Sequence, residues 1–139
     1  MTGPPGDEVV AALALCRAAE KEQALYYRAL ASLAEARDDA ELSQRFHDLH
    51  ADEQHHLSRL TARLLELGLH PPDLSGLAAP GVDLDDWEVA TRRREEAEVD
   101  RYRELVSHRM DDQTRALIEE ILEVEIQHAR ELGGKWTPA

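Results

Sequence analysis

The sequence predicts an all-α protein that folds as a four-helix bundle, and three observations support this fold class. Hydrophobic residues make up 42% of the 139 residues but aromatic residues only 4%, a balance typical of helices packed through leucine and alanine. Four long stretches repeat apolar residues every three or four positions, which is the period of an amphipathic helix. Only one internal stretch, residues 68–83, is rich in proline and glycine. We therefore expect one domain, residues 1–139, with a single long connection.

The first two helices are expected at residues 7–36 and 40–67. A short break at Asp38 and Asp39 separates them, and Gly68 follows the second. Because the break is so short, these two helices should form an antiparallel hairpin.

Polar residues interrupt the apolar faces of both helices. On the first helix, Glu20 lies within an apolar row that runs from Leu13 to Ala34. On the second, Glu53 and His56 interrupt a row of leucines in the same way. A buried carboxylate without a partner is costly, so these residues are expected to have partners in the core. The other histidines of the second helix, at positions 47, 50 and 55, lie off this face and should point to solvent.

The third and fourth helices are expected at residues 84–108 and 112–132 and should form a second hairpin. The connection at 68–83 could reach ~50 Å when fully extended, which exceeds the ~40 Å length of a helix of about 27 residues. It can therefore cross from one end of the bundle to the other. A plain up-down-up-down bundle, or exchange of the second hairpin between two chains, stays open.

The inner face of the third helix is unusually polar. Its expected residues are Glu88, Thr91, Glu95, Glu98, Tyr102 and Leu105. On the fourth helix, Glu125 and His128 lie on the face that carries Ile121 and Leu132.

These polar residues repeat one pattern twice. Glu53 and His56 are three residues apart, as are Glu125 and His128, and each pair follows a glutamate on the preceding helix. Residues at i and i+3 share a helix face, so each pair can offer a carboxylate and an imidazole to one metal ion. Helical dinuclear carboxylate sites take one glutamate from each of two helices and one Glu-x-x-His pair from each of the other two. The sequence thus predicts six metal ligands: Glu20, Glu53, His56, Glu95, Glu125 and His128. The alternative is a metal-free bundle in which these residues only form hydrogen bonds with one another.

Charge and cysteine content limit the partners and the compartment. The net charge of −13 disfavours nucleic acid and acidic lipid, and no apolar run approaches the ~20 residues of a membrane span. Cys16 is the only cysteine, and the N-terminus lacks the basic segment of a secretory signal. We expect a cytoplasmic protein that binds neither nucleic acid nor membrane.

Nearly the whole chain resembles the rubrerythrin branch of the ferritin-like superfamily. The resemblance is carried by Glu20-Lys-Glu-Gln-Ala-Leu-Tyr-Tyr27, Asp52-Glu-Gln-His-His56, Glu95-Glu-Ala-Glu98-Val-Asp-Arg-Tyr102 and Glu123-Val-Glu-Ile-Gln-His128. It implies a ferritin-like bundle of two hairpins joined by a crossover. It also implies two iron ions at the six ligands, although manganese would accept much the same set.

The resemblance further implies roles for three residues beside the six ligands. Glu98 falls at the position of an extra glutamate that, in rubrerythrins, exchanges with a histidine as ligand when the iron changes redox state; His56 would be its partner here. Tyr27 and Tyr102, each seven residues after a ligand glutamate, would hydrogen-bond ligand carboxylates. Ordinary packing in the core is the alternative for both tyrosines.

The leading hypothesis is a diiron oxidoreductase that oxidises ferrous iron with peroxide or dioxygen. Rubrerythrins carry a rubredoxin module with four cysteines, which this sequence lacks, so the resemblance implies an external electron donor, rubredoxin-like or another reductase. A homodimer, with or without exchanged helices, is expected. The alternatives are iron storage without dedicated turnover, oxygenation of an organic substrate, and a metal-free interaction bundle.

Overall fold

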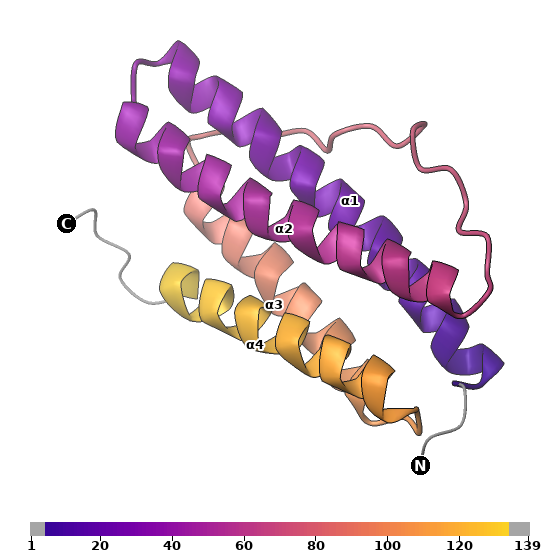
Figure 1. Ribbon diagram of the computed structural model, residues 1–139. Helices are drawn as coiled ribbons and strands as arrows, with labels where there is room; N and C mark the ends of the chain where they lie inside the picture. The colour runs from indigo at the N-terminus through magenta and orange to yellow at the C-terminus, as the bar shows by residue number, and fades with distance from the viewer. Residues whose placement is uncertain (1–4, 134–139) are drawn as a thin grey trace. The chain divides into compact units, whose positions relative to one another are not determined.

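The computed structural model describes residues 5–133, and that part of the chain contains four α-helices and no β-strand (Figure 1). The helices are α1 (Asp7–Ala36), α2 (Ala40–Glu66), α3 (Trp87–Val106) and α4 (Asp112–Gly133). Among the described residues, no helix combines the length and the apolar character that a membrane span requires.

The chain divides into two compact units. One unit, here called the α1–α2 unit, is Arg17–Trp87. The other, the α3–α4 unit, combines the described residues up to Cys16 with those from Glu88 onward. The expectation of a single domain stays a prediction.

The α1–α2 unit contains an antiparallel helical hairpin (Figure 1). The hydroxyl of Ser43, near the start of α2, donates to the carbonyl of Ala31 at 3.3 Å. About two turns further along α2, Nδ1 of His50 lies 2.8 Å from the carbonyl oxygen of Ala24. The contacts therefore move back along α1 as α2 advances. The half-buried position of His50 corrects the expectation that this ring points to solvent, whereas His47 and His55 are exposed.

Two aspartates form the turn between α1 and α2: one caps α2, and the other adopts a positive φ. Asp39 is the N-cap of α2, and its side chain accepts a hydrogen bond from the backbone N–H of Leu42 at 3.1 Å. Asp38 has a φ of 58°, in the left-handed region that aspartate tolerates better than most residues.

Removing the cap should destabilise the hairpin. We expect Asp39→Ala to lower the free energy of unfolding by about 1 kcal/mol, because one N–H at the start of α2 loses its acceptor. Urea denaturation followed by circular dichroism measures this loss. Asp38→Gly is the matched control, since glycine adopts a positive φ without strain and should leave stability equal or higher. Equal stability losses in both variants would contradict the assignment of Asp39 as the cap.

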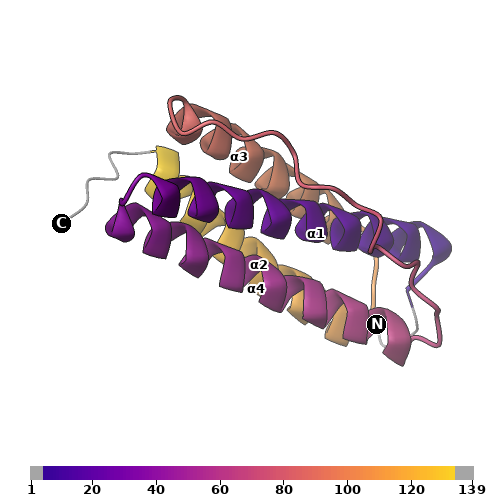
Figure 2. The same ribbon diagram turned by 90° about the horizontal axis from the view of Figure 1, so that it is seen from above.

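The crossover between α2 and α3 runs back along α1 (Figure 2). It begins after Gly68, whose φ of 81° ends α2 in the way that glycine favours. Near its start, the Arg17 guanidinium on α1 donates to the carbonyl of Pro72 at 2.8 Å. Near its end, Asp85 lies 3.6 Å from Arg37, at the other end of α1. The connection thus spans the length of the hairpin, as its composition and length indicate.

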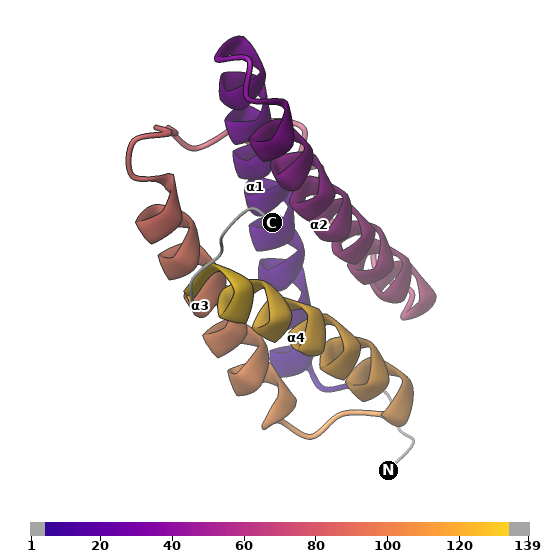
Figure 3. The ribbon, with the colours of Figure 1, turned by 90° about the vertical axis from the view of Figure 1, so that its left-hand side faces the viewer.

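The α3–α4 unit contains a second antiparallel hairpin (Figure 3). Its turn is held by Arg115, which donates to the carbonyls of Val106 and His108, both at 2.8 Å. Asp111 caps α4 by accepting a hydrogen bond from the N–H of Thr114 at 3.1 Å.

The third helix is shorter at both ends than the sequence indicates. It begins at Trp87 because the carboxylate of Asp83 accepts a hydrogen bond from the N–H of Asp85 at 2.9 Å, and this Asx turn competes with helix formation. Trp87 is then buried with its ring 4.9 Å from that of Phe46, whereas Glu88, expected on the inner face, is exposed. At the other end, Ser107 Oγ donates to the Glu104 carbonyl at 2.6 Å as the helix closes.

Candidate metal centre

Each unit brings together three of the six predicted ligands. In the α1–α2 unit these are Glu20, Glu53 and His56, called the first triad. One ligand atom from each lies within 4.8 Å of the others, and Nδ1 of His56 is 3.5 Å from Oε1 of Glu20. The two glutamates are completely buried and the histidine is 3% exposed. The first triad therefore lies inside the protein, although its members are among the most polar side chains.

The local structure explains how the first triad forms. Glu53 and His56 are three residues apart on α2, so both project from the face that carries the buried Leu49 and Leu60. Glu20 reaches them from α1, where Cys16 and Ala24, one turn before and one turn after it, are also buried.

The α3–α4 unit contains the second triad, Glu95, Glu125 and His128. Nδ1 of His128 lies 3.6 Å from Oε2 of Glu95 on α3 and 3.5 Å from Oε1 of Glu125 on its own helix. All three ligand atoms are again within 4.8 Å of one another. Both glutamates are completely buried, and the histidine is 4% exposed. The two triads thus match in composition, spacing and burial.

The charge and the distances of each triad fit one divalent cation. Two carboxylates carry a charge of −2, and burying such a charge is costly unless a counter-charge accompanies it. Metal–ligand bonds of about 2.1 Å place neighbouring ligand atoms roughly 3 to 4 Å apart around a shared ion. The observed separations of 3.5 and 3.6 Å fall in that interval. A set of carboxylate oxygens and imidazole nitrogens suits iron and manganese.

Both histidines turn the same ring nitrogen toward the carboxylates. In His56 and in His128, Nδ1 is the atom within 3.6 Å of a glutamate oxygen. Nδ1 is therefore the nitrogen that would bind a metal, which requires the proton of the neutral ring to reside on Nε2.

Glu98 is buried, at 4% exposure, but belongs to neither triad. Its Oε1 accepts a hydrogen bond of 2.6 Å from Nη1 of Arg101, one turn further along α3. Burial, the largest single effect, would lower the pKa of Arg101. The attraction and the hydrogen bond to Glu98, with smaller contributions from Cys16 and Tyr102, together raise the pKa above its ordinary value. The ion pair engages Oε1 and restrains the position of the Glu98 carboxylate. The ligand role of Glu98 stays a prediction.

The Glu98–Arg101 pair should contribute to stability. We expect Arg101→Gln to lower the free energy of unfolding by about 1–2 kcal/mol, between the values for exposed and for buried ion pairs, because Arg101 is 38% exposed. A double-mutant cycle with Glu98→Gln, measured by urea denaturation, isolates the pair. Strictly additive single effects would mean that the two side chains do not interact in solution.

The two tyrosines predicted beside the ligands are among the most buried side chains. Tyr27 on α1 and Tyr102 on α3 are both completely buried. Their proposed hydrogen bonds to ligand carboxylates stay predictions. Sequence reasoning did not single out Gln23, which is 1% exposed and lies one turn after Glu20. Its i+3 spacing from a buried glutamate is the signal that could have identified it.

Comparison with known proteins identifies the fold. The structure matches that of a bacterioferritin from Desulfovibrio desulfuricans with a TM-score of 0.82 and 23% sequence identity; the match covers 91% of this chain and 76% of the other. The fold is therefore that of the ferritin-like four-helix bundles, as the sequence predicts. The structure of that bacterioferritin is described as showing its diiron site in different catalytic states. No protein-family model matches the sequence, and a search of curated proteins finds no relative.

Proposed function

We propose that the two triads bind two iron ions and that the chain is a non-haem diiron protein. The observation that carries this proposal is the presence of two matched, buried sets of two carboxylates and one imidazole, each with a charge that one divalent cation would neutralise. That the two ions share one dinuclear centre is supported by the likeness in fold to a diiron protein.

We further propose that the protein oxidises ferrous iron with peroxide or dioxygen. Two ferrous ions held there would supply the two electrons that, with two protons, reduce one hydrogen peroxide to two waters, and both ions would become ferric. In this scheme the four glutamates, Glu20, Glu53, Glu95 and Glu125, would hold the two ions through their carboxylates. The histidines contribute neutral donors and tune the redox potential.

The resemblance to rubrerythrins supports a finer proposal. Glu98 and His56 would exchange as ligands, and Tyr27 and Tyr102 would orient ligand carboxylates. Repeated turnover would require electrons from a rubredoxin-like protein or another reductase.

Anaerobic loading with two ferrous ions per chain, followed by stopped-flow mixing with hydrogen peroxide or with dioxygen, tests the reaction. We expect the rate with peroxide to exceed that of free ferrous iron by at least about tenfold, and His56→Ala with His128→Ala to lose this excess. A faster reaction with peroxide than with dioxygen would favour a peroxidase, and the reverse would favour a ferroxidase. A wild-type rate no greater than that of free iron would refute catalysis.

Iron storage is the second candidate, because the matched structure is a bacterioferritin. Storage requires an assembly that encloses a mineral, whereas the proposed peroxidase needs no more than a homodimer, with or without exchanged helices. Native mass spectrometry or light scattering of the iron-loaded protein distinguishes storage from the peroxidase. A closed shell of many subunits favours storage. A dimer excludes storage inside a self-assembled shell.

A further inference from the structure

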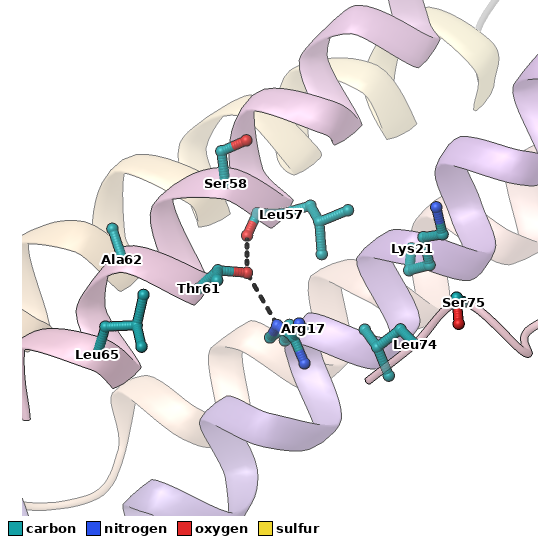
Figure 4. A pocket seen from close by; sticks show the side chains of 9 residues that line it. All are labelled: Arg17, Lys21, Leu57, Ser58, Thr61, Ala62, Leu65, Leu74 and Ser75. Carbon is teal, nitrogen blue, oxygen red and sulfur yellow. Dashed lines mark hydrogen bonds between the residues drawn. The ribbon is translucent and has the colours of Figure 1, made fainter. Parts of the chain in front are cut away.

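A pocket of about 480 Å³ lies within the α1–α2 unit, between α1, α2 and the crossover (Figure 4). None of the first-triad residues lines it. Its volume falls within the range of about 300–1,000 Å³ that is usual for small-molecule sites. The pocket therefore has room for a ligand and is lined by none of the candidate metal ligands, although Lys21 and Leu57 directly follow Glu20 and His56 in the chain.

Two cations from α1, Arg17 and Lys21, line this pocket. In a chain with a net charge of −13, such cations would ordinarily pair with nearby carboxylates. Within residues 5–133, however, neither lies within ion-pair distance of a carboxylate, and Arg17 attracts Asp73 only at longer range. Arg17 donates instead to neutral oxygens, from Nε to the hydroxyl of Thr61 and from Nη1 to the carbonyl of Pro72, both at 2.8 Å.

These two hydrogen bonds fix the orientation of the Arg17 guanidinium and leave its other N–H groups available to a ligand, because arginine has five. Thr61 is itself held, since its hydroxyl donates to the carbonyl of Leu57 at 2.8 Å, as Figure 4 shows. The guanidinium is therefore pre-oriented at the pocket and need not be ordered when an anion arrives.

The remaining lining is mainly apolar. Leu57 and Leu65 from α2 and Leu74 from the crossover contribute aliphatic surface, and Leu65 is 55% exposed. Ser58 and Ser75 add hydroxyl groups. A ligand that covered Leu65 would remove apolar surface from water, which favours binding by about 25 cal/mol per Å².

From this arrangement we propose that the pocket binds a small organic anion, with a carboxylate or phosphate group at Arg17 and Lys21 and a short apolar group against Leu65 and Leu74. This ligand complements both the charge and the apolar surface of the pocket. The site is independent of iron and of the proposed oxidation.

Asp73, beside the pocket on the crossover, opposes the ligand. Its two carboxylate oxygens accept hydrogen bonds from the N–H and the hydroxyl of Ser75, each at 2.9 Å. These bonds, with a smaller contribution from Arg17, lower the pKa of Asp73, so it is anionic near neutral pH. Asp73→Asn removes this charge and keeps an oxygen for the Ser75 N–H, so it should strengthen anion binding several-fold.

Isothermal titration calorimetry of the full chain with octanoate tests the proposal, with octanol, octylamine and inorganic phosphate as comparison ligands. We expect octanoate to bind in the micromolar to low-millimolar range and more tightly than all three comparison ligands. Lys21→Glu should weaken octanoate binding by about tenfold or more, whereas Arg28→Glu, an exposed arginine on the same helix, should change it less than about twofold.

Several results would overturn the proposal. Equal affinity for octanol would mean that the cations contribute nothing, and equal affinity for inorganic phosphate would mean that the apolar wall contributes nothing. Equal losses in Lys21→Glu and Arg28→Glu would indicate non-specific charge attraction. An unchanged affinity in Asp73→Asn would place the anionic group of the ligand away from this pocket. Loss of octanoate binding after removal of metal would place the ligand at the metal instead. If Lys21→Glu does not fold, Lys21→Met provides the same comparison.

Discussion

Loading the metal-free chain with manganese(II) should raise its midpoint of thermal unfolding by about 10–20 °C. A ligand present at 100 times its dissociation constant stabilises the folded state by about 2.7 kcal/mol per site, and two sites double this. For a chain of this size each kcal/mol corresponds to a few degrees. Manganese is the probe because its ligand preference resembles that of iron and it is less readily oxidised by air. Differential scanning calorimetry with and without the metal measures the shift.

The control for this shift is an exposed glutamate on a helix that carries a triad. Glu119→Ala on α4 should retain the full shift, because its side chain is exposed. The double variant His56→Ala, His128→Ala should lose most of it. A shift of equal size in this double variant would show that manganese stabilises the protein through surface carboxylates, and the triads would then not be metal sites.

Replacing triad glutamates by glutamine should have the opposite effect on the metal-free chain. We expect Glu95→Gln with Glu125→Gln to raise the free energy of unfolding by about 2 kcal/mol or more in the absence of metal, because two buried like charges become neutral groups of the same shape. The same variant should show no stabilisation by manganese. Urea denaturation in the presence of a chelator measures the first effect.

Two exposed glutamates of α4, the helix that carries Glu125, provide the matched comparison. Glu119→Gln with Glu123→Gln should change stability by less than about 0.5 kcal/mol per substitution, as is usual on a surface. If the triad variant is less stable than the wild type without metal, the glutamates stabilise the core through hydrogen bonds. That result would favour the metal-free interaction bundle.

Much of the fold could be predicted from the sequence because its signals are local. The apolar period of α1, α2 and α4, the cap at Asp39 and the positive φ of Gly68 depend on residues close together in the chain. The start of α3 was misplaced for a local and a longer-range reason. Trp87 packs on Phe46, some 40 residues earlier, and the Asp83 side chain forms a turn where a helix was expected.

In the candidate site, too, most features set by residues close together in the chain could be predicted, and those set by distant contacts could not. The Glu-x-x-His pairs were recognisable because i and i+3 share a helix face, and the structure does bring each pair to its partner glutamate. The link between Glu98 and Arg101 has the same spacing but was overlooked, because an exposed arginine on a polar helix looks like an ordinary surface residue. The pocket beside Arg17 could not be predicted, since it depends on the path of the crossover past α1.

Metal content is the measurement that tests the central claim most directly. Inductively coupled plasma mass spectrometry on protein expressed with iron supplied should find about two iron ions per wild-type chain. The double variant Glu53→Ala, Glu125→Ala, which removes one carboxylate from each triad, should contain almost none. Absence of metal from the wild type, or the same content in the variant, would contradict a dinuclear site at these residues.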